Sequence, residues 1–213
     1  MGTLAGLLTL ADSRLPAGGH AHSGGAEEAC ALGIVHDEPS LEAFLARRLT
    51  TAGRVAASLA AAACRNPASV PVLDVEAEAR IPSPALRAAS RAQGRGLVRV
   101  GRQAWPHRAW DDLPPSPHHP LAIGVAAHAA GLDPRDAATA AAYLAVSGPA
   151  TAAQRLLGMD PMKVAAATAR IATAVDAEAD KATRDTTPSA VTDPLLDLLA
   201  EQHATRRERY FAS

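Results

Sequence analysis

The helical period is clearest in residues 40–64, which read SLEAFLARRLTTAGRVAASLAAAAC. Apolar residues recur there every three or four positions, as on one face of an α-helix. This stripe consists of Leu41, Phe44, Leu45, Leu49, Ala52, Val55, Ala56, Leu59, Ala60 and Ala63. Polar side chains such as Glu42, Arg47 and Arg54 lie away from it. We predict one long helix over 40–64, ended by Asn66-Pro67.

Several other helices are predicted from their starts. A capping side chain followed by proline suits the first helical turn, where the missing N–H would have no partner anyway. Such pairs occur at Ser83-Pro84, Asp133-Pro134, Asp160-Pro161 and Asp193-Pro194. We therefore predict an all-α bundle of about eight to ten helices, forming one domain over residues 1–213. The expected helices lie near 4–12, 24–32, 40–64, 69–79, 84–104, 118–131, 134–157, 161–183 and 194–210.

Two segments are expected to depart from regular helix. Gly148-Pro149 falls inside 134–157, where proline should kink or split the helix. Residues 105–117 are rich in proline and irregular in pattern. We interpret them as a surface crossing pinned to the bundle by Trp105 and Trp110, with a mobile loop as the alternative.

The composition supports a helical protein and narrows the function. Apolar residues make up 48% of the chain but aromatic residues only 3%, unlike the aromatic-rich pattern of all-β proteins. The net charge of −1 provides no basic field for nucleic acid. No apolar run reaches the roughly 20 residues that span a bilayer, and Met1 to Leu10 has no basic start typical of a signal peptide. We expect a cytoplasmic protein without nucleic-acid or membrane partners.

Sequence motifs for catalysis are missing. The chain has no GxxxxGK[ST], HExxH or GxSxG pattern, and no GxGxxG after an expected strand. With only two cysteines, and no CxxC pair, a zinc module is not expected. Histidines at 20, 22, 118 and 119 could serve as nickel or zinc ligands if they converged. The simpler interpretation is that they are surface or capping residues.

A glycine-rich segment, LPAGGHAHSGGAEE at 15–28, is the sharpest local feature. Its glycines allow backbone conformations that other residues avoid. Ser23 is predicted to cap the following helix, with Glu27 and Glu28 in its first turn. The segment is either a simple connection between helices or a shaped loop that presents His20 and His22 to a partner.

The end of the chain, residues 204–213, is a candidate partner-binding tail. Arg206, Arg207 and Arg209 would suit the negative end of a helix dipole. However, Tyr210 and Phe211 beside arginines are also typical of protein interfaces. Both interpretations remain open.

At these two places the chain resembles the urease accessory protein UreF family, in its actinobacterial type. The N-terminal match is LLTLADSRLPAGGHAHSGGAEEA, and others are ASRAQGRGLVRV at 89–100, HPLAIGVAAHAAGL at 119–132 and RYFAS at 209–213. Two positions differ: His20 replaces the family's usual aromatic residue, and RLLGMDP after Gln154 is looser than its Leu-Gly-Gln pattern. The resemblance covers nearly the whole chain.

The resemblance implies an all-α, non-enzymatic chaperone that helps insert nickel into urease. Such proteins dimerise, bind the accessory protein UreD (also called UreH), and recruit the GTPase UreG to apo-urease. No cofactor is then expected on this chain, since UreG binds the GTP, and no metal ligand is assigned. It also implies that the C-terminal segment becomes ordered when the UreD-like partner binds.

The site residues come from the two segments singled out above and from the motifs that the chain shares with the family, whose partner surface maps onto this glycine loop and tail. The implied partner-binding residues are Gly18, Gly19, His20, His22, Ser23, Glu27, Arg206, Arg209, Tyr210 and Phe211. Pro16, Gly25 and Gly94 are expected to shape the structure. The alternative function is a helical nickel-binding or storage protein that uses His20, His22, His118 and His119. Whether an arginine acts as a GTPase finger or only as an anchor stays open; simple docking is the preferred interpretation.

Overall fold

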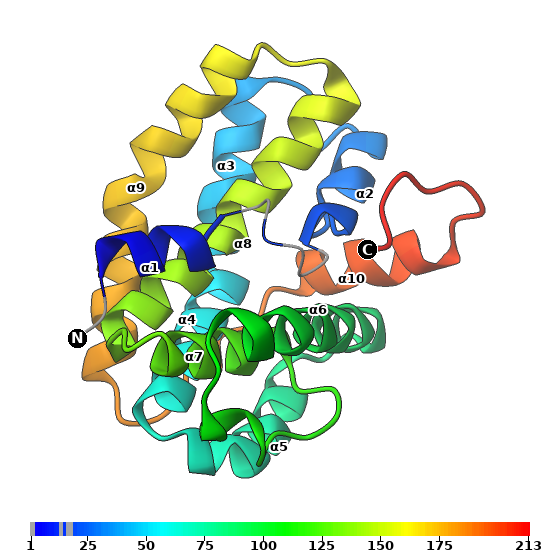
Figure 1. The fold of residues 1–213 in the computed structure, drawn as a ribbon. Coiled ribbons are helices and arrows are strands. Elements are labelled where there is room, and N and C mark those ends of the chain that lie inside the picture. The colour runs from blue at the N-terminus through cyan, green and yellow to red at the C-terminus, as the bar shows by residue number, and fades with distance from the viewer. Residues whose placement is uncertain (1–2, 13–14, 16–18) are drawn as a thin grey trace.

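The computed structural model describes residues 3–12, 15 and 19–213, without the side chain of His20. The described part is helical and contains no strand, which confirms the predicted all-α class. Its helices pack into a single domain (Figure 1). The α-helices are α1 (Leu4–Leu10), α2 (Ala26–Ala31), α3 (Glu38–Arg48), α4 (Arg54–Arg65), α5 (Val70–Arg80), α6 (Pro84–Ala104), α7 (His119–Ala129), α8 (Pro134–Leu157), α9 (Pro161–Arg184) and α10 (Pro194–Thr205).

The predicted proline starts are confirmed at α6, α8, α9 and α10. Each begins at its proline, and the preceding side chain accepts a hydrogen bond from an N–H of the first turn. At α8, for example, Asp133 accepts from the Asp136 N–H at 2.9 Å. These helices begin where local chemistry satisfies N–H groups that have no partner within the helix.

The predicted helix over 40–64 is interrupted by a change of period. One π-helical turn, η2 (Leu49–Gly53), separates α3 from α4. Within and beside this turn, the hydroxyls of Thr50 and Thr51 donate to the carbonyls of Ala46 and Arg47. Such side-chain bonds compete with the regular helical pattern. The path stays helical, but the single uniform helix was wrong.

Helices α4 and α8 form the centre of the bundle. Together with α2, α3, α9 and α10, parts of them enclose one apolar cluster, and with α1, α5, α6 and α7 a second. Close approach depends on small residues: a Cβ added at Gly124 of α7 would lie 2.4 Å from the Ala60 carbonyl of α4. Alanine-rich surfaces therefore let the helices pack with few large side chains between them.

The segment at 105–117 crosses the surface as predicted, with one short 3₁₀ turn, η4 (Arg108–Trp110). Trp110 is buried and its Nε1–H donates to the Trp105 carbonyl at 2.9 Å. Gly101 of α6 leaves room for the Trp110 ring, since a Cβ there would lie 2.5 Å from it. The segment is thus pinned to α6 mainly through Trp110.

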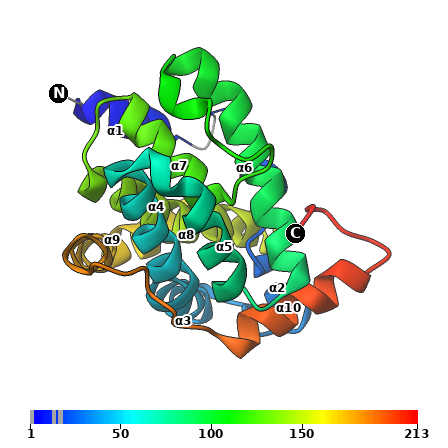
Figure 2. The ribbon, with the colours of Figure 1, turned by 90° about the horizontal axis from the view of Figure 1, so that it is seen from below.

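The C-terminal part differs from the prediction. Helix α10 ends at Thr205, not near residue 210. Residues 206–213 instead leave the helix and turn back, so that the C-terminus lies beside α2 and α10 (Figure 1). Seen from below, the same end of the chain also lies beside α6 (Figure 2). No helix in the described part of the chain is long and apolar enough to cross a membrane.

Candidate interaction site at the glycine loop and the C-terminal tail

The C-terminal tail (residues 206–213) is held to α2 by one buried carboxylate. Glu27 accepts hydrogen bonds from the N–H groups of Tyr210 at 2.8 Å and Phe211 at 3.0 Å. It also contacts His203 Nε2 of α10 at 2.8 Å. Burial opposes ionisation of Glu27, but these hydrogen bonds outweigh it and lower its pKa. Glu27 therefore joins three segments as a charged acceptor.

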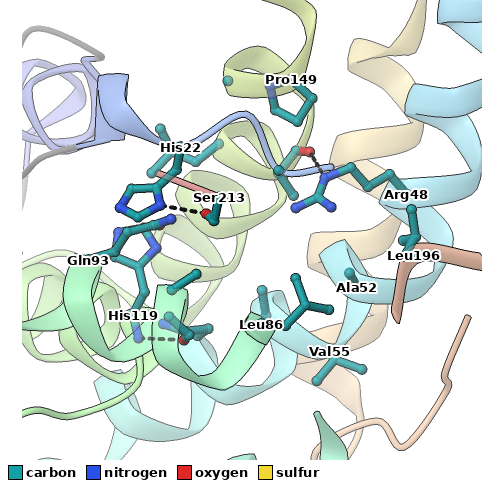
Figure 3. A pocket seen from close by; sticks show the side chains of 18 of the residues that line it. His22, Arg48, Ala52, Val55, Leu86, Gln93, His119, Pro149, Leu196 and Ser213 are labelled. Carbon is teal, nitrogen blue, oxygen red and sulfur yellow. Dashed lines mark hydrogen bonds between the residues drawn. The ribbon is translucent and has the colours of Figure 1, made fainter. Parts of the chain in front are cut away.

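Backbone bonds continue this contact to the last residue. The Ala212 N–H donates to the Ala21 carbonyl at 2.6 Å, and the Ser23 N–H donates to a Ser213 carboxyl oxygen at 2.5 Å. His22 Nδ1 lies 2.6 Å from Ser213 Oγ (Figure 3). The structure thus brings the two segments singled out in the sequence, 19–28 and 206–213, into direct contact.

A second buried carboxylate supports the same contact. Glu28 of α2 is 2% exposed, and its Oε2 accepts from Arg206 Nη1 at 3.0 Å. Arg206 is the C-cap residue of α10, and this bond joins its side chain to α2. Of the two interpretations left open for the tail, the placing of its arginines at a helix end holds for Arg206 but not for Arg207 and Arg209, which lie beyond α10.

The tail presents some side chains outward and one inward. Arg207, Arg209 and Tyr210 are exposed, the last at 87%. Phe211 is half-buried and packs against the cluster that contains α2 and α3. The docked backbone therefore holds an arginine and a tyrosine at the surface, with Phe211 as its apolar anchor.

The turn before α2 is built by glycine rather than by the predicted serine cap. Gly25 is the N-cap residue, with a φ of +88° that other residues rarely adopt. Ser23 is fully buried, and its Oγ has no hydrogen-bond partner among the residues described. The prediction that Ser23 caps α2 was wrong, because the left-handed turn places Gly25 at that position.

Gly24 leaves room for Arg48, which donates to a carbonyl that Pro149 leaves without a helical partner in α8. Pro149 has no N–H, so the Ala145 carbonyl one turn earlier lacks its helical partner. Arg48 Nε donates to that carbonyl at 2.9 Å (Figure 3). A Cβ at Gly24 would lie 2.9 Å from Pro149 Cγ and 3.1 Å from Arg48 Cζ. Helix α8 therefore runs through Pro149 without the split that we considered from the sequence.

Comparison of the sequence with known proteins shows to which family the chain belongs. The family model named UreF matches residues 35–172. The chain belongs to the UreF family. It is 50% identical to "Urease accessory protein UreF" of Mycolicibacterium vanbaalenii over 218 aligned residues and 50% identical to that of Mycobacterium marinum over 216. The protein of the same name from Mycobacterium sp. (strain JLS) is 49% identical over 213 residues. Each alignment covers all of both chains.

These relatives extend the likeness to both parts of the candidate site. The loop at 19–28 and the tail at 206–213 lie outside the matched stretch of the UreF model, but inside the full-length alignments. The expected resemblance to actinobacterial UreF proteins is confirmed, since these relatives come from mycobacteria.

The predicted site residues fall into three groups. Those that lie on the two segments that the structure brings into contact are Gly19, His22, Ser23, Gly25, Glu27, Arg206, Arg209, Tyr210 and Phe211. Pro16, Gly18 and the side chain of His20 lie outside the described residues. Gly94 lies elsewhere, on α6, where a Cβ would come 1.9 Å from the Pro117 carbonyl oxygen.

Sequence reasoning missed four contributors to this site. Glu28 was noted only for its place in the first turn, and His203, Arg48 and Ser213 were not singled out for any contact. For Arg48 a partial signal existed, because Pro149 implies an unpaired carbonyl at Ala145. Nothing local in the sequence indicates that Arg48 supplies the donor.

His118 was expected to be a surface or capping residue; it is the N-cap residue of α7, without a side-chain cap bond, but it is buried rather than at the surface. Its Nδ1 lies 3.1 Å from Ser90 Oγ and its Nε2 2.9 Å from Glu78 Oε2. A hydroxyl, an imidazole and a carboxylate in contact are the groups that nucleophilic catalysis often uses. Here, however, Ser90 Oγ also accepts from the His119 N–H, so the cluster fastens the start of α7 to α5 and α6. We assign it a structural role.

The described residues contain no group of three or more His, Cys, Asp or Glu side chains that could hold a metal ion. His22 contacts Ser213, whereas His118 contacts Ser90 and Glu78. Of the histidines proposed as ligands of a nickel store, His119 lies near His22, His118 is bound to Ser90 and Glu78, and the side chain of His20 lies outside the described residues.

The stability of the chain should fall in mild acid because of His119. Burial, together with the nearby His22, lowers the pKa of His119 to about 4. The unfolded chain takes up this proton near pH 6.5, so stability is full above that pH and declines as the pH drops toward 4. Burial also lowers the pKa values of His22 and His118, in the same direction. We expect His119→Gln to flatten this decline.

Urea unfolding at a series of pH values measures this effect. The exposed His36, replaced by Gln, is the matched control and should leave the decline as in the original chain. Equal pH dependence in the His119→Gln variant and the original chain would contradict the assignment.

Proposed function

We propose that this chain acts in urease maturation as a non-catalytic docking subunit. In this proposal it binds a UreD/UreH-like accessory protein and the GTPase UreG in the cytoplasm, as a homodimer, and so helps deliver nickel to apo-urease. GTP is bound by UreG and not by this chain. Membership of the UreF family, at about 50% identity over the whole chain, is the observation that carries the proposal.

The docked tail supports an interface at this site. Interfaces often depend on a few arginine and aromatic side chains, and Arg209 and Tyr210 are held outward by a backbone fixed to Glu27. A guanidinium at that position suits a carboxylate on the partner, with two parallel hydrogen bonds. The tail is docked on Glu27 without a partner, unlike the ordering on binding that the family resemblance implies, so binding would lose little conformational entropy there. Partner recognition then needs no chemistry on this chain, only contact.

The proposal predicts that a paired variant, Arg209→Ala with Tyr210→Ala, loses its partners without unfolding. Two such anchors typically contribute at least about 2 kcal/mol, or roughly 30-fold in affinity. Co-purification of this chain with UreD- and UreG-like proteins from the same urease system tests it. We expect the original chain to retain both proteins and the variant to lose UreG, UreD or both.

The matched control replaces an exposed arginine and a tyrosine elsewhere, Arg184→Ala with Tyr143→Ala. This control should still co-purify with both proteins. If the tail variant retains both partners as well as the control does, the site assignment is wrong. If the unmodified chain binds neither protein, the proposed function itself is wrong.

A further inference from the structure

A cavity of about 260 Å³ lies beneath the docked tail. Side chains from α4, α6, α7, α8 and α10 line it, together with the loop at His22–Gly24 and the tail (Figure 3). Its apolar wall includes Val55, Leu59, Leu86, Ile123, Leu144 and Leu196. A dry cavity of about 150 Å³ can hold benzene, so this space suits a ligand with a short apolar chain.

Arg48 places a positive charge at this apolar space, and only one of its nitrogens bonds to a described residue. Arg48 lines the cavity, and its Nε bonds to the Ala145 carbonyl. Among the described residues, no hydrogen bond or ion pair is formed by its two terminal nitrogens. Burial lowers the pKa of Arg48 to about 10, so it stays charged at neutral pH. Its remaining donors are therefore available to an anion in a mostly apolar site.

The other charged side chains at the cavity are differently placed. Asp193 accepts two hydrogen bonds from Arg47, at 2.5 and 2.7 Å. Arg80 pairs with Glu76 and donates to the Ser189 carbonyl at 3.1 Å. Arg155 is exposed, and Asp197 is half-buried on α10, where burial raises its pKa. Burial also lowers the pKa values of His22 and His119. Arg48 is thus the half-buried cation whose donors remain for a ligand.

We propose that this cavity binds a small monocarboxylate with a short apolar chain. The carboxylate accepts two hydrogen bonds from the terminal nitrogens of Arg48, in the paired geometry that guanidinium favours. The apolar chain lies against the wall formed by Val55, Leu59 and Ile123. A ligand-binding function of this kind is independent of the proposed docking function.

The tail forms part of the wall of this site. Phe211 and Ser213 line the cavity, on the side of His22. The carboxyl end of the chain is held there by the Ser23 N–H, and no ion pair joins it to Arg48 among the residues described. A bound ligand should therefore stabilise the docked tail, because Phe211 and Ser213 supply part of the wall that it contacts.

Hexanoate is a suitable probe, with 1-hexanol as its uncharged match. Titration calorimetry of the full chain at neutral pH should show saturable binding of hexanoate and at least about tenfold weaker binding of hexanol. Arg48→Met should weaken hexanoate binding at least tenfold. Arg155→Met, which changes an exposed arginine at the same cavity, should leave the affinity unchanged.

A second variant keeps Arg48 and its bond to α8. Ala52 lines the cavity beside Arg48 (Figure 3), and Ala52→Leu fills part of the space. This variant should also weaken hexanoate binding at least tenfold, while circular dichroism shows a folded chain. Undetectable hexanoate binding by the original chain would overturn the proposal. So would unchanged binding in both Arg48→Met and Ala52→Leu, or an equal loss in Arg155→Met.

Removal of Ser213 by a carboxypeptidase tests the role of the tail. If the ligand requires a docked tail, hexanoate at ten times its dissociation constant should slow this cleavage about tenfold. Hexanol at the same concentration is the control for effects on the protease. Equal cleavage rates with and without bound hexanoate would overturn the assignment of the tail as a wall of the site.

Discussion

Replacement of Gly94 by alanine is expected to lower the free energy of unfolding by about 3 kcal/mol. A Cβ at this position would lie 1.9 Å from the Pro117 carbonyl oxygen and 3.3 Å from the His118 carbonyl carbon. Both are backbone atoms, so relief requires α6 to move away from the start of α7. The displacement would also disturb Ser90, which accepts from the His119 N–H.

The sign of this effect is informative because helix propensity acts the other way. Alanine is favoured over glycine by about 1 kcal/mol inside a helix when nothing obstructs it. Gly6 of α1 is the matched control, since a Cβ there meets only ordinary contacts, at 3.6 Å from Thr3 Oγ1 and 3.8 Å from Leu132 Cδ2. Urea unfolding followed by circular dichroism should show Gly94→Ala less stable and Gly6→Ala as stable as the original chain or more so. A Gly94→Ala variant at least as stable as the original would contradict the close contact.

Glu27→Ala is expected to release the tail and to destabilise the chain by about 3 kcal/mol. The substitution removes the acceptor for Tyr210 N–H and Phe211 N–H, and it leaves His203 buried without its carboxylate. Hydrogen exchange at the amides of Tyr210 and Phe211 reports release of the tail, and urea unfolding reports the loss of stability.

Glu208→Ala is the control for this prediction. Glu208 lies in the same tail but is exposed, so its loss should change neither amide exchange nor stability appreciably. If Glu27→Ala left the amides of Tyr210 and Phe211 as protected as in the original chain, the carboxylate would not be what holds the tail. Glu27→Ala releases the tail, whereas Arg209→Ala with Tyr210→Ala removes only exposed side chains and leaves the tail docked. A comparison of these two variants separates docking of the tail from contact with the partner.

Helix starts were predictable because their chemistry is local. Asp133, Asp160, Asp193 and Ser83 satisfy N–H groups only two or three residues away, so the capping signal needs no tertiary contact. The helix ends and internal breaks were less predictable. The pattern of residues 194–210 favours a helix, yet α10 ends at Thr205, and further on the N–H groups of Tyr210 and Phe211 bond to Glu27 of α2.

The two segments of the candidate site could be located from the sequence, but the contacts between them could not. Glu27, His22 and the RYFAS end were each singled out, whereas their mutual contacts cross more than 180 residues of the chain. The serine cap failed for a similar reason, since Gly25 adopts the left-handed turn that brings α2 under the tail.

Sequence by itself determined the helical class, the proline-marked helix starts, the family and the two segments of the candidate site. These depend on periodicity, capping and motif order, all of which act over short stretches of chain. Only the tertiary structure decided that Glu27 holds the tail and that Arg48 donates to the Ala145 carbonyl, which Pro149 leaves without a helical partner. It also formed the cavity that Arg48 and the tail line. A buried donor or acceptor takes whichever partner the fold brings near, and that choice is invisible to local pattern.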